Sequence, residues 1–201
     1  MICAYVELNV NLTLIAQINL LINALENKFK YGNLDKHEMF VDENNARMMN
    51  VLKMSILRLA EDLNFKEKND DALKVLNHVK EKFLYENAPY YSPYNGYFNV
   101  FNMRWIELYY RSGHPEAAVE VYTKFIDDLA DCIRFYKLPN SFAQRYQSEY
   151  EASKQFVHTL DQIAMTFNDQ KLKSLLVNKF PELVSGNVQP INQPSIDIQA
   201  N

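Results

Sequence analysis

Cysteine and glycine are both scarce in this chain of 201 residues, which has two of the first and four of the second. The two cysteines, Cys3 and Cys132, are too few for a disulfide-rich scaffold or for a zinc site built from cysteines. The shortage of glycine argues against an all-β fold, because such folds have many tight turns, and it favours helices. The composition therefore predicts an all-α fold.

Basic residues are also scarce: 21 Lys and Arg stand against 25 Asp and Glu, which gives a formal net charge of −4. Nucleic acids and anionic membranes attract proteins through clusters of Lys and Arg, and the sequence has no such cluster. We therefore expect no nucleic-acid partner. The hydrophobic fraction of 48% is that of an ordinary globular protein. A single domain of this length can bury roughly 70% of its unfolded surface.

Motifs for catalysis and metal binding are missing from the sequence. It has no Gly-rich phosphate loop, GxSxG elbow or HExxH motif. Paired carboxylates occur at Asp70–Asp71, where they suit the positive end of a helix, and at Asp127–Asp128, which we interpret as part of a solvated helix. Four isolated histidines complete the candidates: His37, His78, His114 and His158. We therefore predict no enzymatic activity, no metal site and no cofactor.

Residues 8–25 carry no charge. Six of these eighteen residues are Asn, Thr or Gln, which are costly in the hydrocarbon core of a membrane. We therefore favour an amphipathic helix within residues 1–26 over a membrane span, which is the alternative. The side chains expected to pack on the rest of the protein are Leu14, Ile18, Leu21, Ile22 and Leu25.

Residues 44–84 predict two helices that fold back on each other across a short polar turn. Apolar residues recur at helical spacing in each half, and two apolar stripes so close in sequence bury each other. Either Asp42 or Asn44 can cap the first helix through its side-chain oxygen. The first stripe consists of Leu52, Ile56, Leu59, Ala60 and Leu63, and the second of Ala72, Val75, Leu76, Val79 and Phe83.

The same pattern returns between residues 100 and 136, with a turn at Ser112–Pro115. One offset, 118 − 72 = 46, superposes seven apolar positions of the two segments. Pairs of helices with alanine at the crossing point resemble tetratricopeptide repeats, which stack into short solenoids. We therefore predict tetratricopeptide-like helical hairpin repeats. The matched positions are Leu59 with Trp105, Leu63 with Tyr109, Ala72 with Ala118, Val75 with Val121, Leu76 with Tyr122, Val79 with Phe125, and Phe83 with Leu129.

The C-terminal third predicts a long helix over residues 141–168, packed behind the second pair, and a short closing helix over residues 169–180. The helical-repeat domain then extends over residues 27–184. Residues 185–201 carry one charge and two prolines without periodicity, which predicts a disordered tail.

Two groups of residues are candidates for binding. The loop predicted at residues 85–99 is rich in tyrosine, which offers a flat apolar face and a hydroxyl to peptides and sugars; the alternative is that these rings cover the end of the helical stack. Arginines on the first helix of each pair can grip a carboxylate if they converge, and otherwise they are scattered surface residues. The candidates are Tyr90, Tyr91, Tyr94, Tyr97, Arg58, Arg104 and Arg111.

Two stretches carry a family resemblance: NKFKYGN at residues 27–33 and VDENNARMMNVLKMSILRLAEDL at residues 41–63. They resemble the C-terminal soluble region of a bacterial family of multi-pass membrane proteins of unknown function, whose membrane parts are similar to protein O-mannosyltransferases. The order of features between residues 27 and 180 also fits that region. This chain lacks the transmembrane helices and the acidic loop in which such a transferase does its chemistry, so the resemblance assigns no catalytic residue.

The resemblance implies a non-catalytic accessory domain in a membrane-associated, extracytoplasmic setting. Residues 1–26 then correspond to a linker from a membrane part. The expected partner is a peptide segment or a membrane protein. The alternative is that the domain holds a glycan or an acceptor during protein O-glycosylation.

Overall fold

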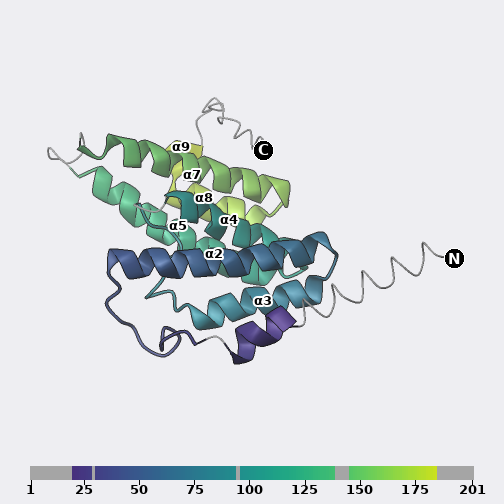
Figure 1. Ribbon diagram of the computed structural model, residues 1–201. Helices are drawn as coiled ribbons and strands as arrows, with labels where there is room; N and C mark the ends of the chain where they lie inside the picture. Colours follow the sequence, from purple (N-terminus) through teal and green to yellow (C-terminus); the bar gives the residue numbers. More distant parts are fainter. Residues whose placement is uncertain (1–19, 29, 94–95, 139–144, 185–201) are drawn as a thin grey trace, which may run out of the picture.

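Helices are the regular elements of the described part of the chain, which comprises residues 20–28, 30–93, 96–138 and 145–184 of this computed structural model (Figure 1). No strand occurs in these ranges, so the all-α prediction is confirmed. Residues 20–27 are helical. The following elements are α2 (Glu43–Phe65), α3 (Asn69–Lys82), α4 (Gly96–Arg111), α5 (Pro115–Tyr136), α7 (Gln147–Thr166), α8 (Gln170–Lys179) and α9 (Pro181–Val184).

The N-terminal prediction is described only in its last part. Ile22 and Leu25 pack against the core as expected. Leu21 is exposed, so its predicted packing is wrong. No helix in the described ranges is long and apolar enough to cross a membrane. The remainder of the 1–26 segment, and the tail predicted at residues 185–201, lie outside the described residues.

The first helix pair consists of α2 and α3, which pack against each other. Helix α2 begins after Asp42, whose Oδ1 accepts hydrogen bonds from the backbone N–H groups of Asn44 and Asn45 at 2.9 and 3.0 Å. These bonds satisfy two N–H groups that have no partner within the helix. Of the two predicted capping residues, Asp42 and Asn44, the cap is therefore Asp42.

One turn geometry joins the helices of three successive pairs, α2–α3, α4–α5 and α7–α8. In each turn a residue with positive φ follows the first helix, and the next N–H bonds back to the carbonyl five residues earlier, as in a Schellman motif. The positive-φ residues are Glu67 (57°), Gly113 (82°) and Asn168 (50°). The bonds are Lys68 N to Leu63 O (2.9 Å), His114 N to Tyr109 O (2.9 Å) and Asp169 N to Ala164 O (3.0 Å).

The spacing of these turns bears on the predicted repeat. The first two turns lie 113 − 67 = 46 residues apart, which is the offset found in the sequence. The third follows after 168 − 113 = 55 residues. Helices α7 and α8 therefore form a third pair with the same connection, whereas the sequence predicted a packing helix and a closing helix.

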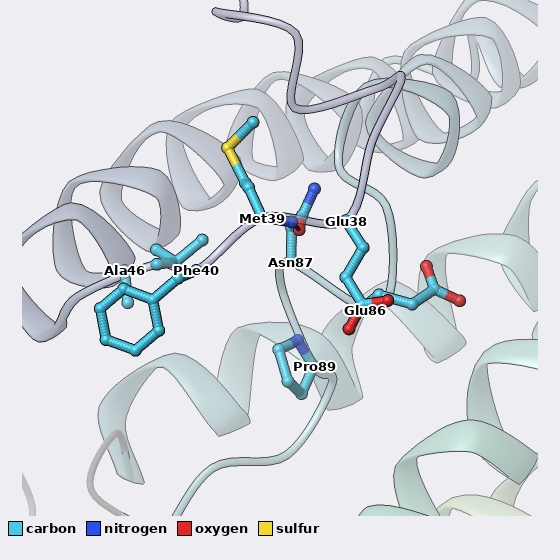
Figure 2. A pocket seen from close by; sticks show the side chains of 8 residues that line it. Glu38, Met39, Phe40, Ala46, Glu86, Asn87 and Pro89 are labelled. Carbon is cyan, nitrogen blue, oxygen red and sulfur yellow. Dashed lines mark hydrogen bonds between the residues drawn. The ribbon is translucent and has the colours of Figure 1, made fainter.

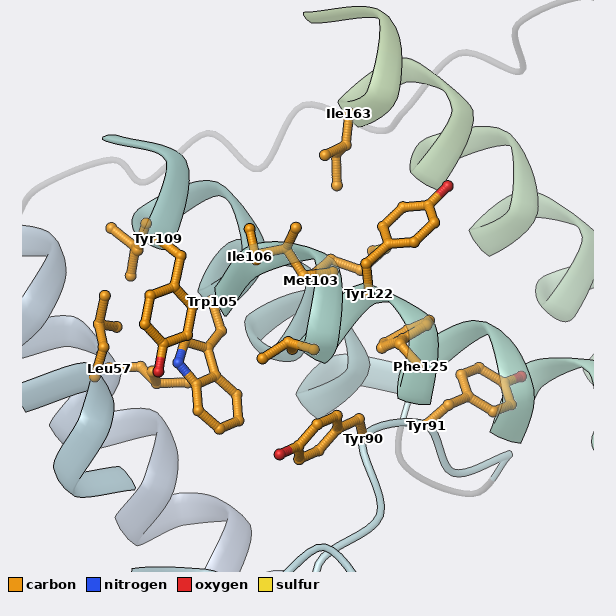
Figure 3. Packing of buried hydrophobic residues seen from close by; sticks show 14 of the residues in the cluster. Leu57, Tyr90, Tyr91, Met103, Trp105, Ile106, Tyr109, Tyr122, Phe125 and Ile163 are labelled. Carbon is orange, nitrogen blue, oxygen red and sulfur yellow. The ribbon is translucent and has the colours of Figure 1, made fainter. Parts of the chain in front are cut away.

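The hydrophobic core follows the matched positions of the first two pairs. Every one of these residues is buried except Leu59, which is partly buried against the core. Trp105 lies at the centre, where its ring stacks on Tyr109 with 6.1 Å between centroids and meets the edge of Tyr90 at 5.2 Å (Figure 3). Burial of the large apolar side chains at the matched positions therefore stabilises the fold.

Candidate interaction surface

The predicted arginines Arg58 and Arg104 lie on neighbouring helices. The Arg58 guanidinium, on α2, lies 5.3 Å from the ring centre of Phe101 on α4. Its Nη2 donates a hydrogen bond of 3.4 Å to the Tyr97 hydroxyl. One helical turn further along, Arg104 on α4 forms an ion pair with Glu61 on α2 at 2.6 Å. These contacts join α2 and α4 through their outer side chains.

Helical spacing gathers exposed apolar residues on the same side. Val51 precedes Arg58 by seven residues, and Tyr97 precedes Arg104 by seven, so each pair shares a face of its helix. Val51, Tyr97 and Val100 are 46%, 61% and 50% exposed. The term α2–α4 face is used here for Val51, Arg58, Glu61, Tyr97, Val100, Phe101 and Arg104.

Positive charge is uncompensated at one point of this face. Arg104 has Glu61 beside it, and Arg111, seven residues or roughly 10 Å further along α4, lies 3.9 Å from Glu107. No carboxylate of the described residues lies within 4 Å of the Arg58 guanidinium. Of the three predicted arginines, Arg58 is thus the one with a free charge, and Arg111 lies apart from the other two.

Two of the predicted binding tyrosines belong to the core. Tyr90 and Tyr91 are only 2% and 4% exposed, and the prediction that their rings face a ligand is corrected accordingly. Tyr90 packs against Trp105, and Tyr91 meets the edge of Phe125 at 5.5 Å (Figure 3). The Tyr91 hydroxyl bonds to the Ser153 hydroxyl at 2.7 Å. The alternative, that the loop tyrosines cover the helical stack, describes both residues.

The other two loop tyrosines have different positions. Tyr97 lies in the first turns of α4, because that helix begins at Gly96, and its ring is exposed. Tyr94 lies outside the described residues. Among the described members of the predicted tyrosine group, Tyr97 is therefore the one that lies on the α2–α4 face.

Asp128 explains why the loop enters the core. Its Oδ2 accepts hydrogen bonds from the backbone N–H groups of Tyr90 and Tyr91 at 3.0 and 3.2 Å, and its Oδ1 accepts one from the Tyr85 hydroxyl. Burial raises the pKa of the Asp128 carboxyl. The prediction of a solvated carboxylate is therefore wrong for Asp128, although Asp127 is half exposed and pairs with Lys179 at 2.6 Å.

Lys53 is a buried charge-bearing residue that the sequence analysis missed. It is 2% exposed, and its Nζ lies 4.7 Å from the ring centre of Tyr90 and 4.8 Å from that of Trp105. Among the described residues this Nζ has no hydrogen-bond partner. Burial lowers the pKa of Lys53 to about 7, against a smaller opposing effect of Asp128. One signal was present: Lys53 continues the buried stripe formed by Met49, Ile56 and Ala60.

A pocket of about 610 Å³ lies between the segment before α2 and the loop after α3 (Figure 2). Its walls come from residues 38–41, 46, 86, 87 and 89. The loop residue Asn87 fastens the two segments together, because its side chain bonds to Met39 N, Leu34 O and His37 O at 2.9, 3.0 and 2.8 Å. The spacing of residues within one helix cannot predict such a pocket, because the pocket depends on contacts between residues nearly fifty positions apart.

The remaining candidates among the described residues are a nucleophilic thiol and metal ligands. Burial raises the pKa of the Cys132 thiol to about 11, so the reactive thiolate is disfavoured at neutral pH. No group of three or more His, Cys, Asp or Glu side chains within these ranges could hold a metal ion. Cys3 lies outside them.

Comparisons of this chain with models of protein families, with curated proteins and with solved structures find no match.

Proposed function

We propose that this chain is a non-catalytic interaction domain, and that its α2–α4 face binds a segment of a partner protein. The observation that carries the proposal is the Arg58 guanidinium, which rests on the Phe101 ring beside the exposed Tyr97 without a carboxylate partner in the described part of the chain. Arginine and tyrosine are the residues in which binding energy concentrates at protein interfaces.

The chemistry of the face suits a partner segment that carries a carboxylate. A guanidinium binds a carboxylate through two parallel hydrogen bonds. The Phe101 ring holds the guanidinium in place, which reduces the entropy lost on binding. Val51 and Val100 add exposed apolar area to the same face. We therefore propose an Asp or Glu side chain, or a C-terminal carboxylate, as the group that meets Arg58.

The tetratricopeptide-like classification is part of this proposal. It is supported by the shared turn of the three helix pairs and by the 46-residue offset of buried residues. Solenoids of helix pairs present extended surfaces to their partners. The resemblance to the soluble region of membrane proteins similar to O-mannosyltransferases motivates the setting that we propose, an accessory domain beside a membrane-associated protein.

The alternative of a glycan or acceptor site came from the resemblance and placed the ligand at the tyrosine loop. Sugars bind to free aromatic faces, and Tyr90 and Tyr91 have none because they are packed in the core. Tyr97 alone keeps an exposed ring in the described part of this group. The protein-binding reading is therefore the one that the surface favours.

The double variant Arg58→Glu with Tyr97→Ala tests the proposal by quantitative pull-down from the native host. It reverses the free charge and removes the exposed ring, so the wild-type partner should be lost from the eluate. A matched control is Arg134→Glu with Phe135→Ala on α5, where both side chains are also exposed. The control should retain the partner.

Circular dichroism of both variants shows whether they fold. If a folded Arg58→Glu, Tyr97→Ala variant recovers the same partners in the same amounts as the wild type, the α2–α4 face is not the binding surface. Loss of the partner from both variants alike would also contradict the proposal.

A further inference from the structure

The pocket between residues 38–41 and 86–89 has no part in the α2–α4 face. Its volume of about 610 Å³ falls in the range of roughly 300–1,000 Å³ that is usual for ligand sites. We propose that this pocket binds a basic side chain, Lys or Arg, together with a neighbouring apolar side chain from an extended segment of a partner protein.

The two sides of the pocket differ in chemistry (Figure 2). One side is apolar, with Phe40 and Ala46. The opposite side holds the carboxylates of Glu38 and Glu86, which come from the two segments that Asn87 fastens together. A ligand that fills both sides needs a cation and an apolar group close to each other.

The acidic side is free to bind a cation. No Lys, Arg or His side chain among the described residues lies within 4 Å of either carboxylate. Many acidic residues elsewhere in the described part of the chain do form ion pairs. Two carboxylates in one pocket attract a Lys or Arg side chain and repel acidic peptides and anionic lipid headgroups. Charge complementarity therefore selects a basic occupant.

The apolar side requires more than a small cation. The Phe40 ring is 95% exposed, so nearly all of its apolar surface is available at the edge of the pocket. A free amine bound to Glu38 and Glu86 leaves this ring in water. A peptide segment with an apolar residue next to its basic residue covers the ring and gains the energy of its burial.

Hydrogen bonds hold the walls of the pocket together. The Asn87 side chain is 5% exposed and makes three hydrogen bonds to residues 34–39. Such bonds in a buried site hold both segments in place. A preformed site loses less conformational entropy on binding than a mobile loop does.

The test is an NMR titration of the ¹⁵N-labelled full chain with the peptide acetyl-Leu-Arg-Leu-amide. The amides of Phe40, Val41, Ala46 and Asn87 should shift, and those of Arg58 and Tyr97 should not. The matched peptide acetyl-Leu-Glu-Leu-amide should leave the pocket amides unchanged. The affinity for the arginine peptide should fall as salt is added, because salt screens exposed charges.

Two variants measure the two sides of the pocket separately. Glu38→Gln with Glu86→Gln should weaken the arginine peptide about 3- to 10-fold, since exposed ion pairs contribute little each. Phe40→Ala should weaken it while the melting temperature stays the same, because the ring is exposed. Asp131→Asn with Glu182→Gln removes two exposed carboxylates elsewhere and should bind the peptide as the wild type does.

Three outcomes overturn the proposal: no shift of the pocket amides at millimolar peptide, equal shifts with the arginine and glutamate peptides, or wild-type affinity in the Glu38→Gln, Glu86→Gln variant. The pull-down with Arg58→Glu and Tyr97→Ala reports on the other surface. The two proposals can therefore fail independently of each other.

Discussion

Replacing Lys53 by methionine should stabilise this protein, although lysine is the native residue. Methionine has a similar length and fills the same space between the Tyr90 and Trp105 rings without a charge. The Lys53 amine is buried and without a hydrogen-bond partner in the described residues. Burial disfavours the charged form of this amine, whereas the unfolded chain keeps it protonated in water. Folding therefore costs free energy at every pH at which the amine is protonated in the unfolded chain.

The size of the effect follows from the pKa of Lys53, which falls from 10.5 to about 7 in the folded protein. The difference is 10.5 − 7 = 3.5 units, and one unit corresponds to about 1.36 kcal/mol. At pH 7 the free energy of unfolding is therefore roughly 4 kcal/mol lower than with a side chain that is neutral in both the folded and the unfolded state. Between these pKa values the unfolded state binds more protons, so stability rises with pH. From pH 7 to 9 the wild type should gain roughly 2 kcal/mol from Lys53.

Urea unfolding at pH 7, 8 and 9 measures this prediction. Trp105 is the only tryptophan of the chain, so its fluorescence reports on the core that contains Lys53. We expect Lys53→Met to be more stable than the wild type at pH 7, by roughly 4 kcal/mol, and to lose most of the rise toward pH 9. The control Lys66→Met removes an exposed lysine at the end of α2. A variant that is less stable than the wild type at pH 7, or that keeps the same pH slope, refutes the reasoning.

Three further predictions concern stability. Asp128→Ala leaves two buried N–H groups of the tyrosine loop without an acceptor and should lower the free energy of unfolding in urea by about 2–4 kcal/mol. The control Asp127→Ala should lower it by under about 1 kcal/mol. Equal costs of the two changes would contradict the assigned role of Asp128. Gly113→Ala places a side chain at φ 82° and should lower the free energy of unfolding by about 1–2 kcal/mol. Glu67→Gly at the equivalent turn should leave stability unchanged or raise it. The opposite order of melting temperatures would show that the turns are not equivalent. Trp105→Ala should cost about 3–5 kcal/mol, and a loss under about 1 kcal/mol in calorimetry would be incompatible with its position in the core.

The helix pairs could be predicted from sequence because their cause is local. Apolar residues at helical spacing give α2, α3, α4 and α5, and the 46-residue offset gives the residues that bury each other. The turns of the first two pairs obey the same offset, down to the positive φ of Glu67 and Gly113. Periodicity therefore predicted the part of the core that the first two helix pairs share.

The candidate site was predicted less well because its geometry depends on distant contacts. Tyrosines of one loop have no periodicity that separates buried from exposed rings. The burial of Tyr90 and Tyr91 is determined by Asp128, 38 and 37 residues away, and the pocket by Asn87, about fifty residues from its partners. The arginines were predicted by position on their helices, but whether each is available to a ligand depends on which of them pairs with Glu61 or Glu107.

The third helix pair shows why the repeat could be followed only through two copies. With the 55-residue spacing of the last two turns, the crossing alanine Ala118 corresponds to position 118 + 55 = 173, which is a lysine. Lys173 reaches Asp161 on α7 with its amine, so charge occupies the place of the close helix contact. Several residues of α8, among them Lys171 and Ser174, are exposed. A polar outer face is what the last unit of a helical stack needs, and exposed residues such as Lys171 and Ser174 give α8 that face.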